Sequence, residues 1–239
     1  MYYETKSRSI VKTISWRILA TLTTITLVYI FIGDVSVALS VGGIEVFLKM
    51  LVYFFHERAW DRIKFGKKQI TPAVIWLTGL AKSGKKEIAF ELEKLLKNRG
   101  FKTEFIDGHS VRGLIHDYGF EKHEVNSHIE RVGVFAKRME DQGIFVIASF
   151  LSPYQESRKT VREICNNFHE VFVNTPVDVC EKRDDTGVYA KAKNGEIKNF
   201  PGVDVQYEKP KSPEVTVNIA EMSAQEAAKI IFDKVSKTF

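Results

Sequence analysis

The sequence predicts an α-helical transmembrane hairpin followed by an α/β domain whose parallel sheet carries helices on both faces. Long apolar runs are crowded between Ile10 and Phe55, which is a membrane signal. After Pro72, short β-rich runs alternate with amphipathic stretches, which is the pattern of a parallel sheet covered by helices. We therefore expect a membrane anchor over residues 1–68 and a globular domain over residues 69–239.

The anchor consists of two apolar segments joined by a very short turn. The first runs from Ile14 to Ile32 and the second from Val35 to Phe55, with Gly33 and Asp34 between them. At about 1.5 Å rise per residue, each segment can nearly cross a hydrocarbon core as a helix. Glu45 and Lys49 lie four residues apart inside the second segment, where they would share one helix face; a structural pair is favoured over an ion path.

Basic side chains flank both segments and predict the orientation of the hairpin. They are Lys6, Arg8, Lys12, Arg58, Arg62, Lys64, Lys67 and Lys68. Since basic flanks stay inside, we expect a two-pass inner-membrane protein with both termini and the globular domain in the cytoplasm and the lipid bilayer as a partner. A cleaved signal peptide is disfavoured because a second apolar segment follows directly.

The charge balance argues against a nucleic-acid partner. The chain has 239 residues with 35 Lys and Arg against 30 Asp and Glu, and the first 68 residues hold 10 of the basic and 5 of the acidic side chains. The basic excess therefore belongs to the anchor, and the globular domain is neutral. Cys165 and Cys180 match no metal or redox spacing, which is typical of a reducing compartment.

Ten regular elements are expected in the globular domain. The predicted strands are Val74–Thr78, Thr103–Ile106, Ile144–Ser149, Val171–Asn174 and Val215–Asn218. The predicted helices are Lys85–Arg99, Asn126–Asp141, Gln155–Cys165, Val177–Arg183 and Ala224–Lys237. Open sheets of this kind bind ligands beyond the carboxyl ends of their strands, so the loops at that edge are the candidates for function.

The first of these loops has the pattern of a phosphate-binding loop. A strand, a glycine-rich turn and a helix follow one another there, and the turn consists of Gly79, Leu80, Ala81, Lys82, Ser83, Gly84, Lys85 and Lys86. Backbone N–H groups and Lys85 would hold the β- and γ-phosphates of a nucleotide. The last position departs from the pattern, because Lys86 stands where a Ser or Thr would ligate Mg²⁺. The fold class is thus a P-loop NTPase-type sheet.

From Val74 to the C-terminus the order of motifs resembles the adenylylsulfate (APS) kinase family. The matching runs are GLAKSGKK, IDGHSVRGL, YGF, SFLSPYQESR, VFVNTP, DTGVYAKAKNGEIKNFPGVD and YEKP. The resemblance implies transfer of the ATP γ-phosphoryl group to the 3′-hydroxyl of APS, which gives PAPS. Because APS kinases are often dimers, the resemblance also implies that this chain could form a homodimer. Residues 7–66 resemble a family of two-helix membrane proteins of unknown function.

The resemblance assigns roles to several residues. Arg183 would lie beside the ATP base, and Phe120 and Phe200 would sandwich the adenine of APS. The remaining acceptor-side residues would be Asp107, Arg112, Arg131 and Lys198. Ser152 occupies the serine of a motif that suggests a phosphoserine, although a helix N-cap is the favoured interpretation. Residues 184–200 would form a mobile lid.

Five positions depart from the family pattern. Lys86 and His109 replace oxygen groups on the magnesium side, while Val125 and Thr186 remove cationic contacts to phosphate or sulfate. His128 replaces an asparagine. The implied cofactor is ATP, with Mg²⁺ carried mainly by the nucleotide because protein metal ligands are missing.

Three hypotheses stay open at this point. In the first, APS phosphorylation survives with Lys85, His109 and Ser152 as the catalytic candidates and His109 as the base. In the second, the acceptor is a related nucleotide without sulfate. In the third, the domain binds nucleotide at the membrane as a scaffold without catalysis.

Overall fold

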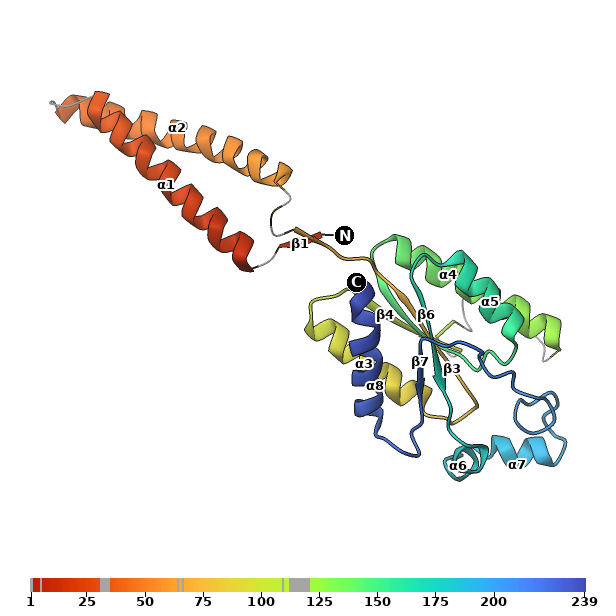
Figure 1. Ribbon diagram of the computed structural model, residues 1–239. Coiled ribbons are helices and arrows are strands. Elements are labelled where there is room, and N and C mark those ends of the chain that lie inside the picture. Colours follow the sequence, from red (N-terminus) through yellow and green to blue (C-terminus); the bar gives the residue numbers. More distant parts are fainter. Residues whose placement is uncertain are drawn as a thin grey trace. The chain divides into compact units, whose positions relative to one another are not determined.

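The computed structural model describes residues 2–4, 6–30, 35–63, 65, 67–108, 110–111 and 121–239. The chain divides into two compact units, Met1–Ile70 and Thr71–Phe239, which Figure 1 colours red to orange and orange to blue. Each unit is held together by contacts among its own residues.

The first unit is a pair of long helices, α1 (Lys6–Ile30) and α2 (Val35–Arg62), which lie side by side (Figure 1). The two predicted membrane segments fall almost entirely within these helices, whereas Gly33 and Asp34 lie outside the described residues. Large apolar side chains such as Ile14 and Phe47 are exposed. Within the described residues, Ser7–Val28 is long and apolar enough to cross a membrane, with a mean hydropathy of 1.2.

A buried arginine joins the open ends of this hairpin. The guanidinium of Arg8 in α1 donates hydrogen bonds to the carbonyl oxygens of Trp60 (2.5 Å), Ile63 (2.9 Å) and Phe65 (2.9 Å). These carbonyls lie at the end of α2, where a helix leaves its last acceptors without intrahelical donors. Strands β1 (Tyr2–Glu4) and β2 (Lys67–Gln69) then pair antiparallel. The two ends of the unit therefore lie next to each other.

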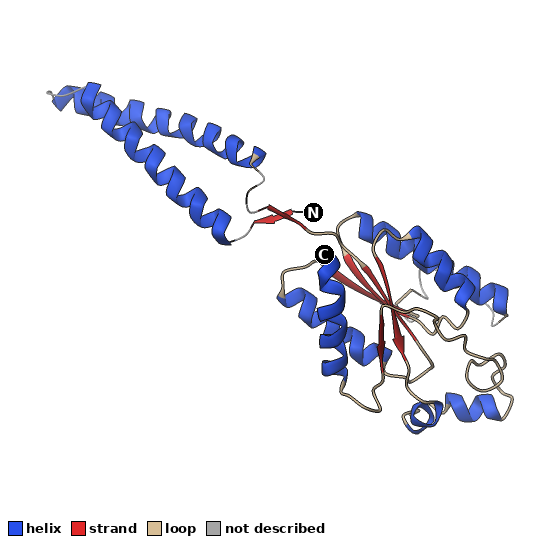
Figure 2. Ribbon diagram, in the orientation of Figure 1, coloured by secondary structure: helices blue, strands red, loops and turns tan. Residues whose placement is uncertain are grey.

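The second unit is built on a five-stranded parallel sheet, drawn in red in Figure 2. Its strand order is β4-β5-β3-β6-β7. The strands are β3 (Val74–Thr78), β4 (Thr103–Asp107), β5 (Phe145–Ser149), β6 (Phe168–Val173) and β7 (Val215–Val217). Strands β3, β5 and β6 are buried along their whole length, as expected when both faces of a parallel sheet are covered.

Helices cover both faces of the sheet. Figure 1 shows α3 (Lys85–Asn98) and α8 (Ala224–Val235) on one face. Helices α4 (Lys122–Asp141) and α5 (Gln155–Ile164) pack on the other. The short helices α6 (Val177–Lys182) and α7 (Val188–Lys193) follow β6, and a 3₁₀ turn over Ser236–Thr238 ends the chain. The predicted fold class is confirmed.

Two helices differ from the prediction by more than one or two residues at an end. Helix α4 begins at Lys122, four residues before the predicted start at Asn126. The reason is a capping box, in which the side chains of Glu121 and Glu124 each accept a backbone hydrogen bond. Helix α7 was not predicted, because the segment that contains it, residues 184–200, was expected to form a mobile lid.

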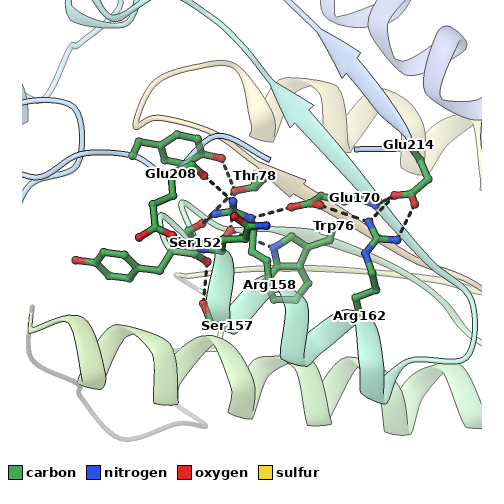
Figure 3. Close-up of polar contacts among 12 residues, drawn as sticks. Trp76, Thr78, Ser152, Ser157, Arg158, Arg162, Glu170, Glu208 and Glu214 are labelled. Carbon is green, nitrogen blue, oxygen red and sulfur yellow. Dashed lines mark hydrogen bonds and ion pairs between the residues drawn. The ribbon is translucent and has the colours of Figure 1, made fainter. Parts of the chain in front are cut away.

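A network of buried polar groups holds the end of the central strand β3 (Figure 3). The Ser152 hydroxyl donates to Thr78 Oγ1 (2.8 Å) and accepts from the Trp76 indole N–H (3.1 Å). Arg158 donates to the Ser152 carbonyl (2.5 Å) and to Glu170 Oε1 (2.8 Å). Because these groups are buried, each needs its partner to offset lost hydration.

Ser152 is not the helix N-cap that the sequence suggested. The N-cap of α5 is Tyr154, which makes no side-chain cap. Ser152 instead adopts φ +37° and is 1% exposed. The N-cap prediction was wrong because Ser152 forms tertiary hydrogen bonds to β3 rather than a local bond to the helix. Its buried hydroxyl is also closed to a modifying enzyme in this conformation.

Replacing Ser152 by alanine should destabilise the second unit. The Ser152→Ala variant leaves the buried Trp76 indole N–H without its acceptor, which costs about 2 kcal/mol of unfolding free energy. Urea denaturation of the full chain in detergent micelles, followed by near-ultraviolet circular dichroism, measures this loss. The control Ser127→Ala changes an exposed serine on α4 and should leave the midpoint in place. Equal midpoints for both variants would contradict the role given to Ser152.

Candidate functional site

Two glycines shape the loop between β3 and α3. Gly79 follows Thr78 directly, and a Cβ on it would lie 2.5 Å from the carbonyl oxygen of Val173 in β6. Gly84 has φ +93°, and a Cβ there would lie 2.1 Å from Cδ1 of Ile219. Only glycine fits such a backbone without strain. The loop is therefore pressed against β6 on one side and delivers the chain into α3 at Lys85 on the other.

Lys85 folds back over the loop that precedes it. Its ammonium donates to the carbonyl oxygens of Gly79 (2.9 Å) and Leu80 (2.6 Å) and approaches Ser83 Oγ (3.3 Å). Burial lowers the pKa of Lys85 to about 8. The N–H groups in the first turn of any helix lack intrahelical acceptors, so the start of α3 favours anions. The Lys85 ammonium and the N-terminus of α3 together form a positively charged surface that suits phosphate groups.

A cavity of about 370 Å³ lies against this positively charged surface at the start of α3. Its size is within the range of small-molecule sites, so the loop leaves room for a polyphosphate. The cavity is lined by Lys82, Ser83, Gly84, Lys85, Lys86, Glu87, Phe90, Ser149, Arg183 and Asp185. The structure thus brings Arg183 and the second half of the predicted loop to one cavity. Gly79, Leu80 and Ala81 belong to the loop but do not line this cavity, and Leu80 packs near Gly202 instead.

The segment after α6 is tied to the loop by polar contacts. The ammonium of Lys82 pairs with Asp185, and the Tyr189 hydroxyl donates to the Ala81 carbonyl oxygen (2.9 Å). Arg183 donates to Glu87 Oε1 (2.6 Å), at the start of α3. The proposed lid, residues 184–200, therefore contains helix α7 and contacts the phosphate loop in this conformation.

Lys86 occupies the metal-ligand position of the loop and is paired with Asp107. Its ammonium lies 3.2 Å from Asp107 Oδ2 at the end of β4. Such loops hold Mg²⁺ through a Ser or Thr hydroxyl, and an ammonium cannot ligate a cation. The described residues contain no group of three or more His, Cys, Asp or Glu side chains placed to hold a metal ion. The donor set therefore does not fit a protein-held Mg²⁺.

A second, smaller cavity of about 170 Å³ lies among α4, the chain after β5 and the end of the lid segment. Phe200 and Lys198, both predicted on the acceptor side, line it together with Ser152, Val125 and His128. The Phe200 ring packs edge-on against Tyr189, with 5.1 Å between ring centroids. Burial and the charge of Arg131 lower the pKa of His128 to about 4, so its imidazole is neutral at physiological pH.

Of the remaining predicted site residues, Arg131 and Asp107 lie in the described part of the chain. His109, Arg112 and Phe120 lie outside the described residues. Arg131 is exposed on α4 and lines neither cavity. Asp107 lies at the carboxyl end of β4, beside Lys86, as its place after a predicted strand suggested.

Sequence reasoning missed several residues that support the site. Asp185 and Tyr189 contact the loop, and Arg158 with Tyr207 holds the end of β3. One signal was available, since Arg158 lies one helical turn before the apolar Val161 in the short helix α5, and in the structure it is 2% exposed. A charged residue on a buried helix face implies a buried partner, here Glu170.

The chain matches two protein families. Residues 71–218 match the adenylylsulphate kinase family, and residues 10–61 match a family of predicted membrane proteins, DUF2061. An adenylyl-sulfate kinase of Clostridium acetobutylicum is 48% identical over 147 residues, which cover 61% of this chain and 74% of that protein. One of Vibrio cholerae is 42% identical over 176 residues, which cover 72% and 82%.

A solved structure shares the fold of the second unit. The APS kinase CysC of Mycobacterium tuberculosis, in complex with AMPPNP and APS, has a TM-score of 0.67 and 33% identity, covering 70% of this chain and 99% of that chain. Sequence and fold agree over the same region, which includes the loop, the cavity and the lid segment. The chain therefore belongs to the adenylylsulphate kinase family of phosphotransferases.

Proposed function

We propose that this protein transfers the γ-phosphoryl group of ATP to the 3′-hydroxyl of adenylylsulfate, giving PAPS, while anchored in a membrane. The observation that carries this proposal is the cavity above Lys85, formed by a phosphate loop in a chain of this family. The relative from Mycobacterium tuberculosis was solved with AMPPNP and APS, which supports ATP as donor and APS as acceptor.

Several described residues of the site have a part in such a transfer. The loop and the start of α3 would bind the phosphate chain through backbone N–H groups. Lys85 would exchange its bonds to the carbonyl oxygens of Gly79 and Leu80 for bonds to phosphate oxygens, bringing a positive charge where negative charge builds up. Tyr189 and Asp185 would hold the lid segment against the loop and exclude water.

The acceptor would enter from the second cavity. Phe200 offers a ring for an adenine to stack on, and Lys198 lies beside it. His109 remains the predicted base for the acceptor hydroxyl. One observation favours a second acceptor class: Val125, which stands in place of a family arginine, lines this cavity with an apolar side chain. A nucleotide without a sulfate group would fit this apolar side of the cavity, because it needs no cationic partner there.

Purified full-length protein in detergent should convert APS and ATP to PAPS and ADP. Removing the Lys85 charge should reduce turnover by at least about a hundredfold, because one charged donor to a phosphoryl group is worth several kcal/mol. Chromatographic detection of PAPS checks this for wild type, Lys85→Met and the exposed control Lys97→Met, which should retain activity. The assay is run with and without Mg²⁺, so that it also measures whether turnover depends on the ion. Turnover of a non-sulfated nucleotide but not APS would identify the second acceptor class, and no turnover of any acceptor would refute the kinase.

The affinity for ATP should fall as pH rises through about 8. The Lys85 ammonium, whose pKa burial lowers to about 8, is charged below that pH and loses its proton above it. Since phosphate binding needs the charged form, the dissociation constant should rise by up to about tenfold per pH unit above 8. Calorimetric titration with AMPPNP at fixed ionic strength measures this slope. The variant Lys85→Arg keeps its charge and should show a flat profile; a flat wild-type profile would contradict the proposal.

The anchoring proposal has three supports. The apolar side chains of α1 and α2 are exposed, the flanks of the hairpin are basic, and residues 10–61 match predicted membrane proteins. The β1–β2 pairing brings the start of the chain beside the segment that leaves α2. Both ends of the hairpin should therefore lie on the same side of the membrane, and the basic flanks support the cytoplasm as that side.

Cysteine labelling tests this topology. A membrane-impermeant maleimide should label Glu4→Cys in inside-out vesicles, whereas it should label Asp34→Cys in right-side-out vesicles. The native Cys165 and Cys180 are buried and give little background. Labelling of both positions from the same side would rule out the two-pass arrangement.

A further inference from the structure

Lys86 has a defined position beside the predicted phosphate site. It is the second residue of α3, and its side chain lines the 370 Å³ cavity. Its ammonium lies 3.2 Å from Asp107 Oδ2 and 5.7 Å from the centroid of the Phe90 ring. The side chain is still 56% exposed, so a ligand in the cavity can reach its ammonium group.

Asp107 is held as a fixed anion behind this lysine. Its Oδ1 accepts the Ser110 backbone N–H (2.8 Å), and its own backbone N–H donates to Ser110 Oγ (2.9 Å). Burial opposes the charge of Asp107, but the Ser110 N–H and the Lys86 ammonium outweigh it and keep the pKa of this carboxyl below its usual value. The carboxylate is therefore ionised at neutral pH and fixes the lysine in place.

The acidic side chains that line the cavity are also engaged. Glu87 pairs with Arg183 at 2.6 Å, and Asp185 pairs with Lys82. With Asp107 held by Lys86, the carboxylates of Asp107, Glu87 and Asp185 each face a cation. A divalent ion placed there would displace one of these pairs and meet the like charge of an ammonium.

We propose that Lys86 is a built-in cation that takes the place of a protein-held divalent metal beside the terminal phosphates, so that the site binds a nucleoside triphosphate as the metal-free anion. The inference rests on the proposed function, because it takes the loop as the ATP site. An ammonium is a compact point charge that suits phosphate oxygens. The positive charges of Lys85 and Lys86 then lie on the first two residues of α3, at its N-terminus.

Calorimetric titration of the full chain in detergent with AMPPNP, in EDTA and in excess Mg²⁺, tests this inference. Wild-type protein should bind in EDTA at least as tightly as in Mg²⁺. The variant Lys86→Ser, which provides the hydroxyl that such loops use for metal, should bind at least about tenfold more weakly in EDTA and recover when Mg²⁺ is added. The control Lys97→Ser removes an exposed lysine at the other end of α3 and should behave as wild type.

The outcomes separate this inference from the proposed function. Wild-type affinity that rises about tenfold or more with Mg²⁺ would overturn the role of Lys86 and leave the kinase in place. Absence of binding in both buffers would refute the ATP site itself.

A second measurement needs no variant. When wild-type protein is added to Mn²⁺–AMPPNP, the nucleotide should leave the metal and the electron paramagnetic resonance signal of free Mn²⁺ should increase. A decrease of that signal, which marks a ternary complex, would overturn the inference even if Lys86→Ser fails to fold.

Discussion

The burial of β3 is the constraint on which the site depends. This strand lies in the middle of the sheet, and its last residue, Thr78, hydrogen-bonds the Ser152 hydroxyl and the Tyr207 hydroxyl (2.8 Å each). The loop therefore starts from a fixed point, and the Val173 carbonyl oxygen lies so close to Gly79 that a side chain has no room there. Backbone N–H groups can bind an anion strongly only when they are held in place before the anion arrives.

The loop carries unusual charges for a phosphate site, and the fold neutralises them locally. Lys82, Lys86 and Glu87 each pair with a partner from another segment, namely Asp185, Asp107 and Arg183. These pairs are partly exposed, so each adds little to stability. Their importance is positional, because they connect the loop to β4 and to the lid segment. A ligand that moves one of these cations also alters the contacts of that segment.

In the first unit, a single residue, Arg8, binds the carbonyl oxygens at the end of a helix. A helix end in an apolar environment leaves carbonyl oxygens that water cannot reach. Arg8 donates to the Trp60 carbonyl in the last turn of α2 and to the Ile63 and Phe65 carbonyls just after the helix, and it lies 5.1 Å from the centroid of the Trp60 ring. It thereby closes the hairpin at the end where β1 and β2 pair. The unit has its own core of contacts, consistent with a family of membrane segments that matches it.

The sequence by itself determined the alternation of strands and helices and the position of the phosphate loop. Val74–Thr78 and the start of α3 at Lys85 agree with the predicted bounds, since hydrophobic period and glycine placement act over a few neighbouring residues. The tertiary structure alone decided that Ser152 binds β3 instead of capping α5, and that Lys86 meets Asp107. These partners are distant in the chain and become neighbours only through the order of the strands, which local pattern does not encode.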